Sequence, residues 1–229
     1  MNNFLELKNI SKSFNTEKKI KVLNNLTYNF KKGKIYSLMG PSGSGKSTLL
    51  NLISLIDRPT NGSIKFNNTQ INFNESSKND IFRAKKIGIV YQQNNLLPDF
   101  TALENLYLAC LSIDDNKKIA MLKAEKLLKK IGLSNRFDHF PSQLSGGESQ
   151  RIAIARAIIN DPDIILADEP TGSLDMKTAK DIFALLNKQK KRDRLIIFAT
   201  HNRFFANKAD YLLELTDGSI KTVNVWVFY

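Results

Sequence analysis

The stretch KIYSLMGPSGSGKSTLL, residues 34–50, decides the fold of this chain. It begins as a short apolar run typical of a buried strand and ends as an apolar-rich helix. Between the two, Gly40-x-x-x-x-Gly45-Lys46-Ser47 has the spacing of a phosphate-binding loop, which requires a strand before it and a helix after it. We therefore predict an α/β fold that binds a nucleotide.

Each residue type in this phosphate loop has an expected task. Glycines let the backbone curl so that its N–H groups point at phosphate oxygens. Lys46 is expected to reach the β- and γ-phosphates and Ser47 to ligate Mg²⁺, while the helix N-terminus adds partial positive charge. A dinucleotide-binding fingerprint is excluded, because Thr48 stands where that pattern has glycine or alanine. The predicted nucleotide-binding residues of the loop are Gly40, Pro41, Ser42, Gly43, Ser44, Gly45, Lys46, Ser47 and Thr48.

Strand and helix patterns alternate along most of the chain, which favours a mostly parallel sheet covered by helices. Strands are predicted at 4–10, 21–30, 34–40, 63–68, 86–91, 163–168, 194–200 and 211–215. Helices are predicted at 46–56, 101–111, 117–132, 147–160 and 176–190. Gly132 is the predicted C-cap of its helix. The apolar residues of that helix available for burial are Ile119, Leu122, Leu127 and Ile131.

The length of 229 residues fits one domain with a subdomain. We predict a sheet core at about 1–92 and 159–229, which begins with an antiparallel β part, and a helical subdomain at about 93–158.

Composition limits the cellular setting. The single cysteine, Cys110, excludes an internal disulfide and fits a reducing compartment. No apolar run approaches the roughly 20 residues that span a bilayer, and the N-terminus lacks the pattern of a secretion signal, so we expect a cytoplasmic chain. The net charge of +12 favours either a polyanionic neighbour or simple solubility.

Two acidic residues, Asp168 and Glu169, follow the predicted buried strand IILAD. Ligands of open α/β sheets bind outside the carboxyl ends of the strands, so Asp168 is expected to hold Mg²⁺ and Glu169 to act as general base on the attacking water. The alternative is a pair of acids that cap the next helix. His201 follows another predicted strand at the same edge, where it is expected to touch the γ-phosphate or orient the water.

A second glycine turn, LSGGESQ at 144–150, opens a predicted helix. Ser145 and Glu148 have the spacing of a capping box. Consecutive glycines beside a cap suggest that a ligand approaches the backbone closely, because glycine otherwise only adds entropy cost. The helix N-terminus is thus a second candidate anion site.

Together, GPSGSGKST, LSGGESQ and IILADEP resemble the ATP-binding cassette (ABC) ATPases over essentially the whole chain. The resemblance implies a P-loop NTPase core with a helical subdomain, ATP hydrolysis with Mg²⁺, and a homodimer that sandwiches two ATP molecules head to tail. The signature of one subunit then closes over the ATP of the other. The signature residues are Ser145, Gly146, Gly147 and Glu148.

Other residues match the family position by position. Phe14 resembles the aromatic residue that stacks on adenine; the alternative is an ordinary aromatic at a strand end. Gln92 resembles the glutamine that joins Mg²⁺ and the attacking water to the membrane partner, with Gln93 beside it as the alternative. Asp175 in GSLD resembles the acid that crosses the dimer interface. Asn202 departs from the family, which often has aspartate after the histidine, and this departure puts the local capping in doubt.

The stretches LLPDFTALEN (96–105) and ADEPTGSLD (167–175) resemble more narrowly the ATPase subunits of lipoprotein-releasing transporters. Integral membrane permease subunits are then the implied partners, at the cytoplasmic face of a bacterial inner membrane. ATPases of macrolide exporters or of cell division are the alternatives. A soluble ABC ATPase that acts on nucleic acid or ribosomes fits less well, because that class usually carries two cassettes or a long coiled coil, and no specific nucleic acid is expected.

Two apolar segments remain. The residues Leu96, Leu97, Pro98 and Phe100 are expected either to form the surface that meets the permease or to pack the core of the helical subdomain. The C-terminal VNVWVFY, from 223, reads as a last strand or a contact surface.

Overall fold

The structure, a computed structural model, describes residues 4–15, 19–113 and 115–223. It forms two compact units, described separately below: Met1–Asp80 with Lys190–Tyr229, and Ile81–Gln189. The second unit is wider than the predicted helical subdomain, and the predicted boundaries at 92/93 and 158/159 stay a prediction.

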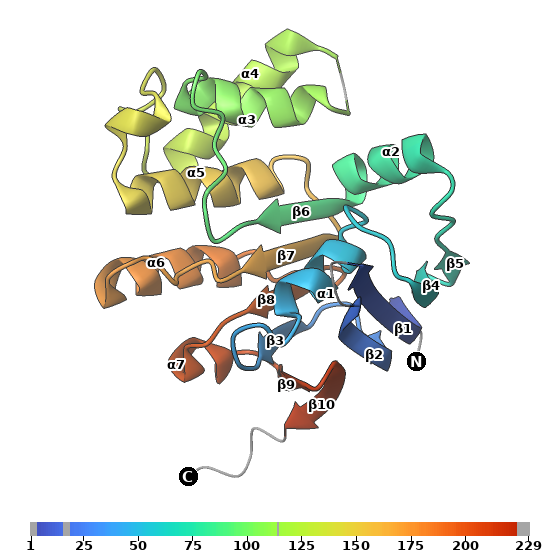
Figure 1. The fold of residues 1–229 in the computed structure, drawn as a ribbon. Coiled ribbons are helices and arrows are strands. Elements are labelled where there is room, and N and C mark those ends of the chain that lie inside the picture. The colour runs from blue at the N-terminus through green and yellow to red at the C-terminus, as the bar shows by residue number, and fades with distance from the viewer. Residues whose placement is uncertain (1–3, 16–18, 114, 224–229) are drawn as a thin grey trace. The chain divides into compact units, whose positions relative to one another are not determined.

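The first unit contains an antiparallel sheet in the order β2-β1-β4-β5 (Figure 1). Its strands are β1 Leu5–Asn15, β2 Lys19–Phe30, β4 Asn61–Phe66 and β5 Thr69–Gln70. Apolar residues on the inner face are buried, among them Leu5, Leu7 and Ile10 of β1. The predicted antiparallel β part is therefore confirmed.

The first unit also contains the strands that position the phosphate loop. β3 runs parallel to β8 and to β9, and β10 pairs antiparallel to β9. The strands are β3 Ile35–Met39, β8 Leu195–Ala199, β9 Tyr211–Thr216 and β10 Ser219–Val223, and the helices are α1 Lys46–Ile53 and α7 Arg203–Ala206. All five residues of β8 are buried, as expected of a parallel strand covered on both faces. Of the C-terminal apolar segment, Val223 ends β10 and the rest lies outside the described residues.

The second unit pairs two parallel strands and carries the helices of the central part of the chain. Helix α2, Ser76–Lys86, spans the boundary between the units. The strands are β6 Ile87–Val90 and β7 Ile164–Asp168, and the helices are α3 Ala102–Leu111, α4 Lys117–Lys130, α5 Gly146–Ile158 and α6 Met176–Asn187, with a 3-10 turn at Pro141–Gln143. Helices α3, α4 and α5 share one apolar core that includes Leu106, Leu128 and Ile152.

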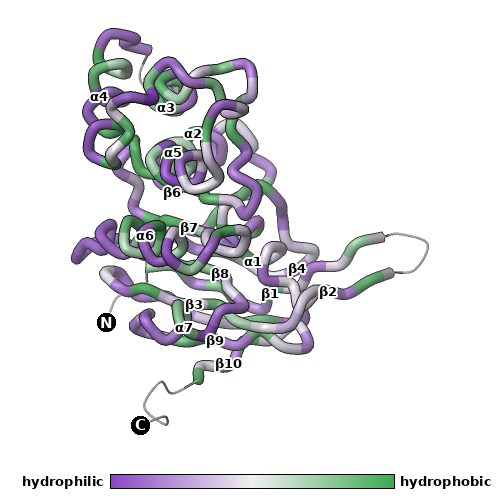
Figure 2. The backbone as a smooth tube through the Cα atoms, turned by 90° about the vertical axis from the view of Figure 1, so that its left-hand side faces the viewer, coloured by the Kyte–Doolittle hydropathy of each residue, from purple (hydrophilic) through white to green (hydrophobic). Residues whose placement is uncertain are grey.

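The buried face of α4 differs from the prediction. Ile119 is 43% exposed and Leu122 58% exposed, so the prediction was wrong for these two residues. Ala120 and Ala124 face the core instead, together with Leu128. Small side chains on the inner face let α4 lie close to its neighbours. Figure 2 shows that hydrophilic and hydrophobic residues are interspersed along this helix.

The end of α4 follows the prediction closely. Gly132 has a φ of 76°, and Leu133 donates to the Leu128 carbonyl at 2.9 Å, which is the Schellman pattern of a helix C-terminus. Among the described residues, no helix combines the length and the apolar character needed to cross a membrane.

Candidate functional site

The phosphate loop joins β3 to α1 in the first unit. Gly45, the N-cap of α1, has a φ of 99°, a left-handed conformation that favours glycine. Within the described part of the chain, no side chain caps this helix and no acidic residue stands in its first turn. The first N–H groups of α1 are therefore available to an anion, in line with the helix dipole.

The loop has no space for a side chain at Gly40. A Cβ there would lie 2.3 Å from the carbonyl oxygen of Leu215 and 2.8 Å from Ser44 Oγ. Ser44 Oγ is one of the buried side-chain atoms that, among the described residues, have no hydrogen-bond partner. An orphaned buried hydroxyl costs about 1–3 kcal/mol, so a ligand oxygen at the loop would relieve this cost.

Lys46 already places its charge at the loop. Its Nζ donates to the carbonyl oxygens of Gly40 at 2.8 Å and Pro41 at 3.0 Å. Two neutral carbonyls do not neutralise an ammonium group, so the positive charge remains to attract an anion. The loop residues therefore fit a bound triphosphate.

His201 lies at the same sheet edge as the phosphate loop. Thr200 N donates to the Leu38 carbonyl at 3.1 Å, which places the end of β8 beside the end of β3. His201 follows directly and is exposed. Asn202 caps the short helix α7 by accepting from Phe204 N at 3.0 Å, so the departure from the family leaves the local capping intact.

In the second unit, Asp168 ends β7 and Glu169 follows in a left-handed conformation, with a φ of 45°. This conformation strains the backbone of a residue other than glycine, and such strain gathers at functional sites. A Cβ on Gly172 would lie 3.5 Å from Glu169 Cβ and 3.7 Å from Gln92 Nε2. The structure therefore brings Gln92 and Glu169 together around Gly172, which favours Gln92 over Gln93 as the matching glutamine.

Asp175 is the N-cap of α6. Its Oδ1 accepts from Lys177 N at 3.0 Å and from Thr178 N at 3.1 Å. The bonds from Thr178 hold the pKa of this exposed carboxyl below its usual range. Asp175 therefore has a local capping task, and its predicted contact across a dimer stays a prediction.

The predicted capping box at the start of α5 is confirmed. Glu148 N donates to Ser145 Oγ at 3.2 Å, and Ser145 N donates to Glu148 Oε2 at 2.8 Å. Arg136 Nε adds a bond of 2.8 Å to the other carboxylate oxygen. The bond from Ser145, followed by that from Arg136, lowers the pKa of Glu148 to about 2.

The two signature glycines differ in their surroundings. A Cβ on Gly147 would lie 2.6 Å from Thr178 Cγ2, so the close packing of α5 on α6 favours glycine there. A Cβ on Gly146 would make only an ordinary contact, 3.7 Å from Leu174. Packing therefore gives a second reason for glycine at Gly147, and the interpretation that a ligand approaches Gly146 and Gly147 stays a prediction.

The low pKa of Glu148 predicts an acid-sensitive helix start. Its charged form gains bonds on folding, so its contribution is complete above the ordinary carboxyl pKa of about 4.3. The contribution is lost as the pH falls towards 2, the folded-state value. Thermal unfolding of the wild type and of Glu148→Gln from pH 7 to 2 measures this: the wild type should lose stability relative to the variant below about pH 4.5. A difference in stability between wild type and Glu148→Gln that stays the same from pH 7 to 2 would contradict the low pKa of Glu148.

Sequence reasoning missed a side-chain clamp beneath the loop 94–101. Asn105 is 1% exposed. Its Oδ1 accepts from Leu97 N at 2.8 Å, and its Nδ2 donates to the carbonyls of Leu97, Phe100 and Thr101 at 3.1, 2.9 and 3.0 Å. Arg156 also donates to the carbonyl of Asn95 at 2.7 Å. The loop is thereby fixed by the buried Asn105 and the half-buried Arg156.

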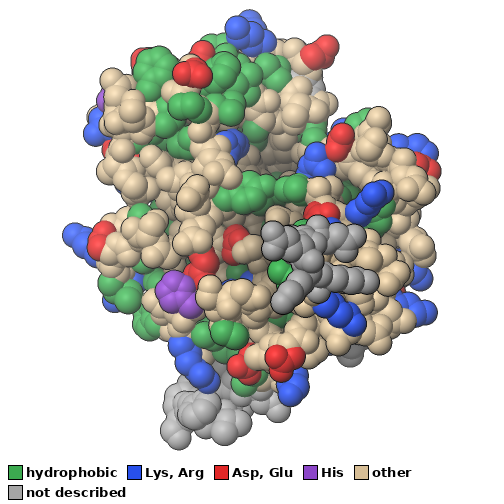
Figure 3. Space-filling model, in the orientation of Figure 1, with side chains coloured by type: hydrophobic (Ala, Val, Ile, Leu, Met, Phe, Trp, Pro, Cys, Tyr) green, Lys and Arg blue, Asp and Glu red, His purple; other side chains and the backbone are tan. Residues whose placement is uncertain are grey.

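The clamp leaves two large hydrophobic side chains of the loop exposed. Leu97 is 42% exposed and Phe100 is 39% exposed. Leu96 packs against the core of α3, α4 and α5, as the alternative interpretation expected. Hydrophobic side chains gather on the surface over α3 and α4, the region of this loop (Figure 3).

Known proteins resemble this chain over most of its length. The ABC transporter family matches residues 23–172. The lipoprotein-releasing system ATP-binding protein LolD of Rickettsia bellii is 43% identical over 96% of this chain and 98% of its own length. LolD of Wigglesworthia glossinidia brevipalpis is 45% identical over 98% of this chain and 100% of its own. An uncharacterized ABC transporter ATP-binding protein of Methanocaldococcus jannaschii is 39% identical over 94% of this chain and 97% of its own.

A solved structure resembles the whole chain as well. The ATP-binding cassette MJ0796, in a dimeric post-hydrolysis state bound to ADP and Pi, superposes with a TM-score of 0.89 at 38% identity. The match covers 98% of this chain and 100% of that chain. With its phosphate loop, signature helix and strand-end acids, the chain belongs to the ABC transporter family, as an ATP-binding cassette.

Proposed function

We propose that the chain is the ATP-hydrolysing subunit of a transporter that releases lipoproteins from a bacterial inner membrane. The proposal rests on the sequence similarity of this chain, over nearly its whole length, to two LolD proteins at 43% and 45% identity. The chain would act at the cytoplasmic face of that membrane, attached to permease subunits. The relative from Methanocaldococcus jannaschii, at 39% identity, is named only as part of an ABC transporter. A test of the proposal therefore has to identify the molecule that the transporter moves.

The proposed chemistry assigns each site residue a task. Lys46 and the N–H groups of α1 bind the phosphates, and Phe14 stacks on adenine. Glu169 accepts a proton from the attacking water, and His201 orients that water or the γ-phosphate. Ser47, Gln92 and Asp168 are the residues that would hold Mg²⁺, which neutralises charge on the phosphates.

The signature completes the site in a homodimer. Ser145, Gly146, Gly147 and Glu148 of one subunit would meet the ATP held by the phosphate loop of the other, and Asp175 would cross the interface. The dimeric state of MJ0796 with ADP and Pi supports this arrangement. Binding of ATP would then close the dimer, and closure would act on the attached permease.

The exposed apolar pair of the clamped loop is the proposed contact with the permease. Phe100→Glu or Leu97→Glu should leave ATP binding by the isolated chain unchanged, because neither residue belongs to the phosphate loop. Binding to the permease should fall about 30-fold, the loss typical of a central interface residue. Pull-down with the permease and ATPase activity in proteoliposomes are the measurements.

Leu122→Glu is the matched control, since Leu122 is a more exposed leucine, 58%, on α4 of the same unit. It should assemble normally. Normal assembly and lipoprotein release by Phe100→Glu and Leu97→Glu would rule out this docking surface.

A further inference from the structure

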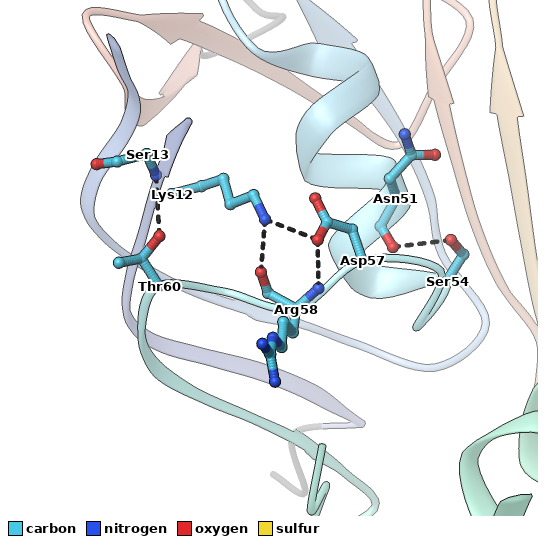
Figure 4. A network of polar contacts seen from close by, with 7 residues as sticks. All are labelled: Lys12, Ser13, Asn51, Ser54, Asp57, Arg58 and Thr60. Carbon is cyan, nitrogen blue, oxygen red and sulfur yellow. Dashed lines mark hydrogen bonds and ion pairs between the residues drawn. The ribbon is translucent and has the colours of Figure 1, made fainter. Parts of the chain in front are cut away.

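Lys12 is a nearly buried lysine on β1, 8% exposed, and lies outside the phosphate loop. A buried ammonium is costly unless it is paired. Its Nζ donates to Asp57 Oδ1 at 2.6 Å and to the Arg58 carbonyl at 2.9 Å, while the Arg58 side chain points away (Figure 4). These contacts join β1 to a segment 45 residues along the chain.

The acceptors of Lys12 are themselves fixed to α1. Asp57 N donates to the Asn51 carbonyl at 3.2 Å, and Asp57 Oδ1 accepts from Arg58 N at 2.7 Å. Asn51 lies in the last turn of α1, the helix whose first residue is Lys46. The position of the Lys12 ammonium is therefore set by the helix that carries the phosphate loop.

The same ammonium lies 4.9 Å from the centre of the Phe14 ring. A cation at this distance over an aromatic face is attracted by the negative face of the ring. Phe14 is 41% exposed, so little apolar packing holds its ring. Lys12 lies over one face of the ring, and the exposed part of the ring is available to a planar ligand.

The cavity beside Lys12 does not explain this lysine. The cavity measures about 470 Å³ and is also lined by Arg58, Thr60 and Phe73, but by neither the phosphate loop nor Phe14. An ammonium group has three hydrogens to donate. Asp57 and the Arg58 carbonyl accept two of them, and the ammonium also lies over the Phe14 ring, so most of its bonding capacity is used away from the cavity.

We propose that Lys12 is a positioning residue for adenine: anchored by Asp57 and the Arg58 carbonyl, it holds the Phe14 ring so that its other face stacks on the base. The inference rests on the proposed function, in which Phe14 meets the base of ATP. It adds a mechanical link, because Lys12 ties the ring that binds the base to the helix that binds the phosphates.

The test separates the base from the phosphates. Lys12→Met keeps the length of the side chain and removes the charge. Calorimetric titration should show affinity for MgATP two- to fivefold lower, about the value of one exposed cation–π contact. Affinity for magnesium tripolyphosphate, which has no base, should not change. Lys8→Met, at an exposed lysine of the same strand, is the control and should change neither.

A double mutant gives the sharper readout. In a Phe14→Ala background, Lys12→Met should cause no further loss of ATP affinity. In the otherwise wild-type chain, Lys12→Arg, which keeps the charge, should bind ATP as the wild type does. If Lys12→Met does not fold, Asp57→Asn, which weakens the anchor, should give a smaller loss confined to ATP.

Three results would overturn the inference. Equal losses for ATP and tripolyphosphate would make Lys12 a structural anchor only. If Lys12→Met kept the wild-type ATP affinity while Phe14→Ala lost affinity, Lys12 would have no positioning role, and the proposed function would still stand. If Phe14→Ala kept the wild-type ATP affinity, both the adenine contact of Phe14 and the positioning role of Lys12 would be refuted. Failure of the wild type to bind ATP would instead refute the proposed function itself.

Discussion

Glu169→Gln is expected to bind MgATP normally and to hydrolyse it about 10²- to 10⁴-fold more slowly, the range typical of a lost general base. The glutamine side chain has the same shape, but its amide cannot accept a proton from water. The substitution also leaves the strained backbone at φ 45° unchanged, because the residue remains unbranched. Phosphate release in single and multiple turnover measures the effect.

The same variant tests the role of the signature. If residues 145–148 complete the site of a partner chain, ATP that is not hydrolysed should hold two Glu169→Gln chains together. Size-exclusion chromatography should then show a dimer with MgATP and a monomer without it. Glu125→Gln on α4 is the control and should hydrolyse ATP normally. A Glu169→Gln enzyme with the wild-type rate would exclude Glu169 as the base.

Lys46→Ala is expected to weaken MgATP binding by about 10- to 100-fold, the value of one or two hydrogen bonds to a charged group. The free energy of unfolding should change little, because the partners of Lys46 Nζ among the described residues are two loop carbonyls, at 2.8 and 3.0 Å. Nucleotide titration and thermal unfolding without nucleotide are the measurements.

The control for this lysine is Lys117→Ala, because Lys117 is the first residue of α4 as Lys46 is of α1. It should bind ATP as the wild type does. Unchanged ATP affinity in Lys46→Ala would refute the phosphate-loop assignment, whereas a large loss of stability would show that the residue holds the loop itself.

The fold could be predicted from the sequence where the signal is local and periodic. The strand, glycine loop and helix at residues 34–50 form one short pattern, and so does the capping box of Ser145 and Glu148, so both were confirmed. Elements too short to show a period, such as β5 with two residues and α7 with four, were missed. Helix α2 was missed as well, because none of its eleven residues is buried and it therefore has no apolar face to show a period. On and just after α4, the predicted burial was correct for Leu127 and Ile131 and wrong for Ile119 and Leu122, because large residues were favoured over Ala120 and Ala124.

The parts of the site that the sequence did not reveal depend on contacts between distant residues. Lys12 and Asp57 meet across 45 positions, and no local pattern announces that Asn105 will fix a loop through four hydrogen bonds. The close approach of Gly147 to Thr178 on α6, 31 residues along the chain, likewise shows only in the structure. These contacts form only when the folded chain brings distant residues together, so no local sequence pattern predicts them.

The central claim is that this cassette converts ATP hydrolysis into release of lipoprotein. Proteoliposomes that contain the permease, a lipidated substrate and this chain test it most directly. The account predicts that MgATP releases lipoprotein with the wild-type chain, and that both release and hydrolysis stop with Glu169→Gln. Hydrolysis by the wild-type complex without any release of lipoprotein, or release that continues with Glu169→Gln, would contradict it.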